Sequence, residues 1–242
     1  MFKKLLMKFK KKPLVLCIHG FGHRRCDEYN NFKLWGVKEF DFITFNIFDI
    51  KDGKDTNPNE WIHRCEVQME NLLKTKRDIT IIGFSMGGVL ASHLASKYKV
   101  QKVFLIAPAF EFITIKNILG AITQIFSNQS SHSKMSSAQI SCFMEVVSKC
   151  KDSISLIDCP ILIVHGDCDN VISSRSSINA YDKIHHQQKR LLILHKGVHQ
   201  LMLDTHTNNE VYQLFKLFMN NRLITYQPQQ ANDSHIKNED SN

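Results

Sequence analysis

The sequence predicts an α/β fold in which helices cover both faces of a mostly parallel sheet. Short runs of Val, Ile, Leu and Phe alternate with segments of helical periodicity through most of the chain. The strand-like runs are nearly continuous in apolar residues, which is typical of strands buried on both faces. The chain has 242 residues, 43% of them hydrophobic and 22% charged. We therefore expect one soluble domain with a sizeable core.

Six strands and four helices of this domain can be placed along the chain. The expected strands are Leu14–His19, Phe42–Phe48, Ile79–Phe84, Val103–Ala107, Ile161–His165 and Leu191–His195. The expected helices are Glu60–Lys74, Gly87–Lys97, Arg175–Ile184 and Asn209–Met219. At most one further strand could come from the N-terminal segment, so we expect a sheet of about six to seven strands.

A helical insertion is expected before the fifth strand, at about residues 110–158. Apolar residues follow a helical stripe there, a Ser-rich link covers 127–137, and a second helical pattern contains Phe143 and Val147. Such an insertion can cap a site or pack onto the domain, and part of it must pack. We assign residues 13–222 to the domain and expect the polar segment 223–242 to be a disordered tail.

The first twelve residues form a basic amphipathic segment. Six lysines between positions 3 and 12 supply +6 of the formal net charge of +8, so the rest of the chain is close to neutral and no nucleic-acid partner is expected. Apolar residues at positions 2, 5, 6 and 9 would form one helical stripe. This segment could touch an anionic membrane surface. We favour the alternative, in which it docks on the domain edge with solvated lysines.

The cysteines and histidines do not indicate a metal or disulfide framework. The seven cysteines are scattered, odd in number and without a C-x-x-C pair, which predicts free thiols and a cytoplasmic protein. His195 and His199 have the i, i+4 spacing of a zinc pair on a helix, but Gly197 lies between them after a strand. We therefore expect no metal.

The decisive motif is "ITIIGFSMGGVLAS", in which an apolar strand runs into G-x-S-x-G and then a helical pattern. A nucleophilic serine must be raised on a tight turn, and that turn tolerates only small residues two positions before and after it, here Gly83 and Gly87. A serine at the start of a helix also lies near free backbone N–H groups. The motif predicts that Ser85 is a nucleophile.

A serine nucleophile needs a histidine base and a carboxylate that orients it. In this motif's chain order the acid follows a later strand and the base follows the last one. The fifth strand ends in "GDCDN", with Asp167 and Asp169 as candidates for the acid and Cys168 as a possible reactive thiol, and the sixth ends in "KGVHQ", which contains His199. Cys168 has no histidine of its own, so we interpret it as a small loop residue.

These motifs resemble the α/β-hydrolase superfamily, in particular its small carboxylesterases and monoacylglycerol-lipase-like members, over roughly residues 13–220. The resemblance implies the α/β-hydrolase fold and a triad of Ser85, Asp169 and His199. "HGF" and "GFSMGG" imply an oxyanion hole formed by the N–H groups of Phe21 and Met86. "HGDCDNVI" is similar to G-x-x-D-x-x-V, which selects Asp169 and leaves Asp167 to cap the turn. "KGVHQ" is similar to G-x-G-H, with valine where the second glycine is usual.

Two features bear on the substrate. The segment "FDIKDGKDTNP" lacks the G-H-G of many lipase-like members, which argues against a close monoacylglycerol-lipase assignment. The insertion resembles the cap of the superfamily and could form an apolar acyl or aromatic pocket. The expected substrate-binding residues are Phe21, Phe112, Ile115, Leu119, Ile122 and Phe126.

The expected function is hydrolysis of carboxylic esters with short-to-medium acyl or aromatic groups, through an acyl-enzyme and without a metal or organic cofactor. The same triad could instead hydrolyse thioesters, lactones or carbon–carbon bonds, or transfer acyl groups. A relative that only binds a ligand or a protein is the alternative outside enzymes. The oligomeric state does not follow from the sequence.

Overall fold

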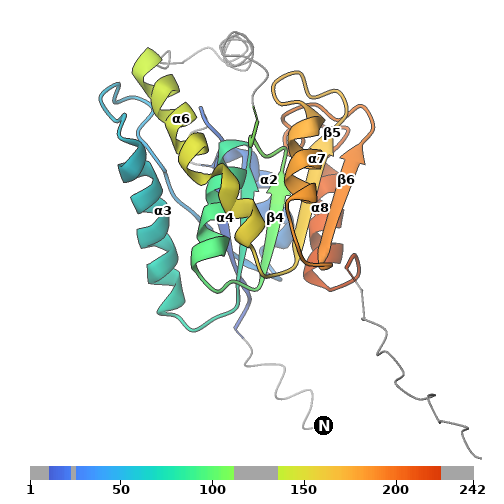
Figure 1. Cartoon of the computed structure of the whole chain (residues 1–242). Helices are drawn as coiled ribbons and strands as arrows, with labels where there is room; N and C mark the ends of the chain where they lie inside the picture. Colours follow the sequence, from blue (N-terminus) through green and yellow to red (C-terminus); the bar gives the residue numbers. More distant parts are fainter. Residues whose placement is uncertain (1–10, 23–25, 112–135, 225–242) are drawn as a thin grey trace, which may run out of the picture.

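The computed structural model describes residues 11–22, 26–111 and 136–224. Within these residues six parallel strands form one sheet in the order β2-β1-β3-β4-β5-β6, so the predicted mostly parallel sheet is confirmed. The arrows of β4, β5 and β6 point the same way in Figure 1. The strands are β1 (Leu14–Ile18), β2 (Asp41–Thr44), β3 (Ile79–Phe84), β4 (Lys102–Ile106), β5 (Ile161–Gly166) and β6 (Lys189–Leu194).

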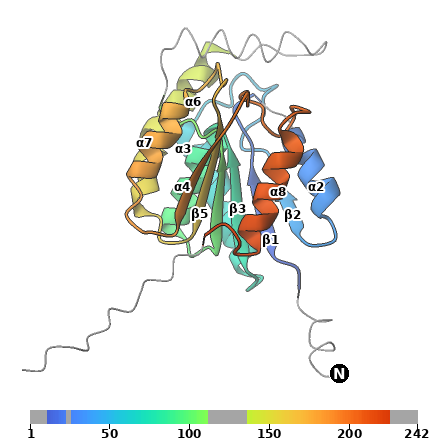
Figure 2. The same ribbon diagram turned by 90° about the vertical axis from the view of Figure 1, so that its right-hand side faces the viewer.

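Helices cover both faces of the sheet, as Figure 2 shows with the sheet seen edge-on. Helices α3, α4, α6 and α7 lie on one face, and α2 and α8 lie on the other. The helices are α2 (Asn30–Gly36), α3 (Pro58–Leu73), α4 (Met86–Lys97), α6 (Ser137–Cys150), α7 (Ser174–Asp182) and α8 (Asn208–Met219), with short 3-10 helices η2 (Asp27–Tyr29) and η3 (Lys151–Leu156).

The core consists of two apolar layers, one on each face of the sheet. In β1, Leu14, Leu16 and Ile18 belong to the layer beneath α3, α4 and α6. Val15 and Cys17 alternate with them and belong to the layer beneath α2 and α8. Every β1 side chain is therefore buried, which explains why the strands are continuous in apolar residues rather than alternating.

Two expectations about local structure were wrong. The second strand was expected to reach Phe48, but β2 ends at Thr44 because the chain turns to other partners there. The Ile47 N–H, for example, donates to Nε2 of His19 at 2.9 Å. Helix α2 was not predicted, because its seven residues are too few for a clear helical period.

The described part of the predicted cap, α6 and η3, packs into the domain. Helix α6 contacts α3 and α4, and η3 contacts α4. Buried residues such as Phe143 and Val147 join the core layer on this face. Residues 112–135, which carry the predicted apolar stripe, lie outside the described residues, as do 1–10 and 225–242. The roles expected for those segments therefore stay predictions.

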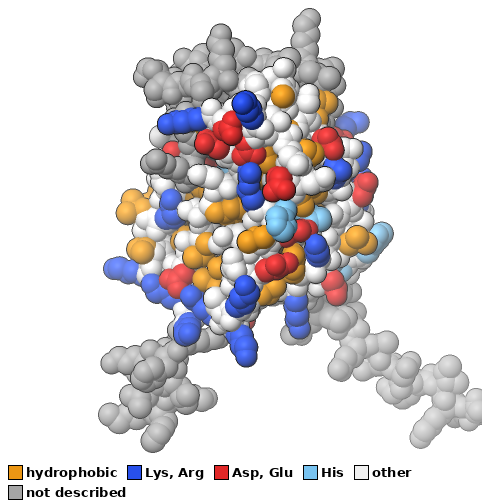
Figure 3. Space-filling model, turned by 90° about the vertical axis from the view of Figure 1, so that its left-hand side faces the viewer, with side chains coloured by type: hydrophobic (Ala, Val, Ile, Leu, Met, Phe, Trp, Pro, Cys, Tyr) orange, Lys and Arg blue, Asp and Glu red, His pale blue; other side chains and the backbone are white. Residues whose placement is uncertain are grey.

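The surface of the α3 side mixes basic and acidic side chains with apolar ones, as Figure 3 shows. No helix among residues 11–22, 26–111 and 136–224 is long and apolar enough to cross a membrane.

Candidate active site

Three loops at the carboxyl edge of the sheet carry the predicted triad. Ser85 directly follows β3, Asp169 lies three residues after the end of β5, and His199 follows β6. Because all strands are parallel, these loops emerge at the same edge, at the top of the view in Figure 1. The topology therefore brings together residues that lie 114 positions apart in the chain.

Ser85 lies on a strained turn between β3 and α4. Its backbone has φ 53° and ψ −118°, a conformation that L-residues rarely adopt. The Ser85 N–H donates to the Ile106 carbonyl at 3.0 Å, which ties the turn to β4. A Cβ at Gly87 would lie 2.1 Å from the Ile18 carbonyl oxygen, and one at Gly83 would lie 2.3 Å from the Gly87 carbonyl oxygen. Only glycine fits at these two positions.

A chain of hydrogen bonds joins the three predicted triad residues. His199 Nδ1 lies 2.7 Å from Oδ2 of Asp169, and His199 Nε2 lies 3.2 Å from Oγ of Ser85. Both residues are buried: Ser85 is 7% exposed and His199 is 5% exposed. The His199 ring also packs near Phe84, with 5.1 Å between ring centroids.

Asp169 is a buried carboxylate with four donors. Oδ1 accepts from the backbone N–H groups of Val171 at 2.8 Å and Ile172 at 2.9 Å. Oδ2 lies 2.7 Å from His199 Nδ1 and 3.1 Å from His165 Nε2. Burial alone would raise the pKa of the carboxyl, but hydrogen bonds from His165 and His199 outweigh burial and hold the pKa well below its usual range. Asp169 is therefore ionised at neutral pH.

The loops after β5 and β6 are in direct backbone contact. A Cβ on Gly166 would lie 2.0 Å from the carbonyl oxygen of Gly197, so glycine is required there. The Cys168 N–H donates to the same Gly197 oxygen at 2.9 Å. The backbone at Val198 is not left-handed, so valine is accommodated where the resemblance led us to expect glycine. These contacts fix the spacing between Asp169 and His199.

The neighbouring candidates have other surroundings. Asp167 pairs with His195 at 2.9 Å on the surface, and the hydrogen bond from His195 lowers the pKa of Asp167. Cys168 is exposed, and its hydrogen bond to Asp167 raises the pKa of the thiol, which disfavours the reactive thiolate.

Two further predicted residues lie beside the serine. Met86 is the first residue of α4, and the N–H groups of a first helical turn have no intrahelical acceptor. Phe21 lies in the loop after β1, where the preceding Gly20 N–H donates to buried Glu28 at 3.1 Å. His19 contacts the Gly20 carbonyl oxygen through Nδ1 at 2.8 Å.

Phe21 packs in an aromatic cluster that the insertion completes. Its ring stacks on Phe143 of α6 with 4.6 Å between centroids. Phe48 lies 5.7 Å from Phe21 and stacks on Trp61 at 4.1 Å. The cluster supports the loop next to Ser85 from the α3 and α6 side. The other predicted substrate-binding residues lie outside the described residues: Phe112, Ile115, Leu119, Ile122 and Phe126.

The sequence interpretation missed three buried polar residues that support this site. Glu28 holds the loop before Phe21, and His165 and Ser177 lie behind Asp169. His165 had a usable signal, because it is a lone polar residue in the apolar run "ILIVHG". Glu28 and Ser177 stand in polar stretches and had no such signal.

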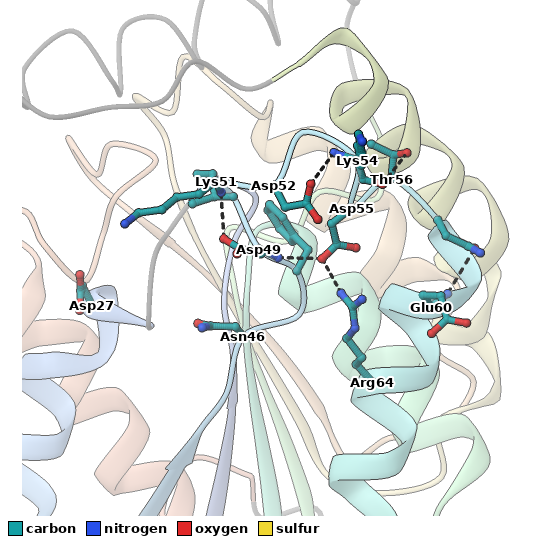
Figure 4. A pocket seen from close by; sticks show the side chains of 13 residues that line it. Asp27, Asn46, Asp49, Lys51, Asp52, Lys54, Asp55, Thr56, Glu60 and Arg64 are labelled. Carbon is teal, nitrogen blue, oxygen red and sulfur yellow. Dashed lines mark hydrogen bonds and ion pairs between the residues drawn. The ribbon is translucent and has the colours of Figure 1, made fainter.

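A polar cavity of about 1080 Å³ lies next to the aromatic cluster, between the loop after β2 and α3 (Figure 4). At its wall Asp55 accepts from Arg64 at 2.7 Å, from Trp61 Nε1 at 3.0 Å and from the Asp49 N–H at 2.8 Å. Figure 4 shows Asp55 and Arg64 pointing toward each other. None of the predicted triad residues lines this cavity. In the described parts of the chain no three His, Cys, Asp or Glu side chains are grouped to hold a metal ion.

Comparison with known sequences gives two partial matches, to a family model and to one relative. The model of the family Hydrolase_4 (Serine aminopeptidase, S33) matches residues 121–206, which include Asp169 and His199. A Mycoplasma genitalium protein named "Putative esterase/lipase 2" is 30% identical over 105 residues, which are 41% of this chain and 39% of that relative. The chain thus matches well under half the length of this relative.

Solved structures are similar over most of the chain. A monoacylglycerol lipase from Paleococcus ferrophilus has a TM-score of 0.67 at 15% identity, and the match covers 88% of this chain and 97% of that one. A soluble variant of monoglyceride lipase from Saccharomyces cerevisiae has a TM-score of 0.66 at 17% identity and covers 90% and 89%. The chain therefore has the α/β-hydrolase fold, as the order of its sequence motifs predicted.

Proposed function

We propose that this chain is a serine hydrolase that cleaves carboxylic esters through an acyl-enzyme intermediate. One observation carries the proposal: a serine on a strained strand-to-helix turn is hydrogen-bonded to a histidine that an ionised, buried aspartate orients. An ordinary structural serine requires neither the strain nor the buried charge. Their combination is typical of an activated nucleophile.

The ionised carboxylate decides which nitrogen of His199 carries the proton. Asp169 can only accept hydrogen bonds, so the proton lies on Nδ1, 2.7 Å from Oδ2. Nε2 is then free to accept from the Ser85 hydroxyl at 3.2 Å. His199 is thus ready to take the serine proton as Oγ attacks a carbonyl, and Asp169 stabilises the imidazolium that forms.

The remaining steps follow from the same groups. The carbonyl oxygen becomes an oxyanion, which we expect the N–H groups of Phe21 and Met86 to bind. His199 returns its proton to the alcohol oxygen as the ester bond breaks, leaving the acyl group on Ser85. Water then gives a proton to His199 as its oxygen attacks the acyl carbonyl, and His199 returns that proton to Ser85 Oγ as the bond between Oγ and the acyl carbon breaks and the acid leaves.

The proposed substrates are esters with short-to-medium acyl or aromatic groups. A Cβ on Gly20 would lie 3.3 Å from Cβ of Ser85, so the loop that carries Phe21 lies against the serine turn. The buried rings of Phe21 and Phe143 stack on each other, and we expect this apolar cluster to favour an apolar acyl group over a charged one. The names of the similar lipases and of the Mycoplasma relative agree with an ester substrate.

A panel of p-nitrophenyl esters from C2 to C12 tests the proposal. We expect the purified chain to hydrolyse the C4 to C8 esters fastest, and Ser85→Ala to be inactive on all of them. Met86→Leu is the matched control, because it changes the adjacent side chain and keeps the backbone N–H. No hydrolysis by the folded chain, or equal rates for Ser85→Ala, would refute ester hydrolysis at this site.

A further inference from the structure

His165 lies directly behind the predicted acid and is fully buried. Its Nε2 lies 3.1 Å from Oδ2 of Asp169 and 3.0 Å from the carbonyl oxygen of Ile172. Its Nδ1 lies 2.6 Å from Oγ of Ser177, a buried residue on α7. Both ring nitrogens are therefore within hydrogen-bond distance of protein groups.

These partners determine the protonation of the ring. A carbonyl oxygen and an ionised carboxylate both only accept, so Nε2, which lies 3.0 Å from one and 3.1 Å from the other, carries a proton. Nδ1 of a neutral ring is then an acceptor, and the Ser177 hydroxyl donates to it.

His165 completes the coordination of the carboxylate. Oδ1 of Asp169 already accepts two backbone N–H groups, and Oδ2 accepts from His199 on the other side. With His165 added, donors surround both oxygens, so the carboxylate cannot rotate without losing one of them. A line of polar side chains in contact extends from the serine to α7 in the order Ser85, His199, Asp169, His165 and Ser177.

We propose that His165, held by Ser177, is a positioning residue that keeps Asp169 ionised and directed at His199. The proposal rests on the proposed function, in which Asp169 orients the base. It assigns His165 an effect on turnover that is transmitted only through Asp169. Ser177 fixes the ring, so its own effect is smaller.

Removal of the His165 donor should have a measurable signature. Without it, the Asp169 carboxylate is protonated more easily, and a protonated carboxyl no longer holds His199 as the base. This change inactivates the site at low pH. We expect His165→Phe to lower kcat about 10- to 100-fold, the cost of one hydrogen bond to a charged group, with little change in KM. The acid limb of the kcat/KM profile should move to higher pH.

Three comparisons separate positioning from a merely structural role. His165→Gln keeps an N–H donor near the Nε2 position and should recover most of the activity. In an Asp169→Asn background, His165→Phe should add no further loss in kcat, because the partner through which it acts is gone. His195→Phe is the matched control, since it removes the donor from the exposed Asp167 pair, and should leave kcat and the pH profile unchanged.

A readout without turnover keeps this inference distinct from the proposed function. The proton between His199 Nδ1 and Asp169 should give a downfield ¹H NMR resonance that shifts in His165→Phe, shifts less in Ser177→Ala and stays in place in His195→Phe. If the wild type hydrolyses no ester, the proposed function fails while this resonance still tests the role of His165. An unchanged resonance in folded His165→Phe, or additive losses with Asp169→Asn, would overturn the inference.

Discussion

Two histidine–aspartate pairs lie a few residues apart in the loops after β5 and β6, and they differ mainly in burial. His195 and Asp167 are 2.9 Å apart, with side chains 81% and 38% exposed. His199 and Asp169 are 2.7 Å apart, with side chains 6% and 0% exposed. The distances alone would not tell which pair belongs to the site.

The surroundings distinguish the two pairs. Water and salt screen the exposed pair, and its side chains keep their freedom to separate. The buried carboxylate is held by backbone N–H groups and two histidines, and its histidine reaches Ser85. Only the buried pair can therefore direct a proton transfer at the serine.

Loss of the serine hydroxyl should have the largest effect on activity. Ser85→Ala removes the atom that would be acylated, so we expect kcat to fall about 10⁵-fold or more on p-nitrophenyl butyrate. The measurement is steady-state kinetics, with circular dichroism as the control for folding. If Ser85→Ala kept a tenth of the wild-type kcat, Ser85 would not be the nucleophile, and neither histidine–aspartate pair would activate it.

Asp169→Asn is the next largest change. The NH₂ of the amide must face either the two histidines or the two backbone N–H groups, which are all donors, so the hold on the tautomer and orientation of His199 is lost and we expect kcat to fall about 10⁴-fold. The ratio of kcat for Asp169→Asn to kcat for Asp167→Asn shows directly which aspartate contributes more to turnover. A ratio near one would contradict the assignment of Asp169.

Asp169 should also affect stability in a pH-dependent way. Its pKa is lowered on folding, so below the usual aspartate pKa of about 3.9 the unfolded chain binds a proton that the folded chain does not. The stabilisation is complete above that pH and is lost as the pH falls further. Urea unfolding should therefore show that the gap in stability between wild type and Asp169→Asn narrows below about pH 4. A constant gap down to pH 3 would argue against a lowered pKa.

Asp167→Asn should have a small effect, with kcat within about twofold of wild type, because an exposed pair contributes little. The test is kcat on the same p-nitrophenyl esters, together with urea unfolding over the same range of pH. A loss approaching that of Asp169→Asn would reverse the roles of the two pairs.

Cys168→Ser should have the smallest effect. The thiol lies between the two aspartates in sequence, but its raised pKa leaves little thiolate at neutral pH. We expect unchanged kcat and slow modification by iodoacetamide at pH 7.5 in the wild type. Inactivation in step with alkylation of Cys168 would give the thiol a role that the structure does not indicate.

The sheet could be predicted from local sequence patterns. The same patterns predicted that the loops after β3, β5 and β6 lie together at the carboxyl edge of the sheet. The apolar run before Ser85 and the helical period after it identify β3 and α4, and chain order places the later loops at the same edge. The choice between Asp167 and Asp169 came from a family resemblance. Spacing alone left both open, since both follow the same strand and either could cap a turn.

The groups behind the triad could not be predicted because their roles depend on tertiary contacts. Ser177 meets His165 only when α7 packs on β5, and Glu28 meets Gly20 only when the loop after β1 folds back. Burial turns these ordinary polar residues into fixed donors and acceptors. The early end of β2 has the same origin, since His19 takes the Ile47 N–H from outside the strand.

The most direct test of the central claim is labelling with a fluorophosphonate, which bonds covalently to an activated serine. We predict a single adduct on the peptide that contains Ser85, no adduct in Ser85→Ala, strongly slowed labelling in His199→Gln and Asp169→Asn, and wild-type labelling in Asp167→Asn. Absence of an adduct on Ser85 in the folded wild-type chain would contradict the account.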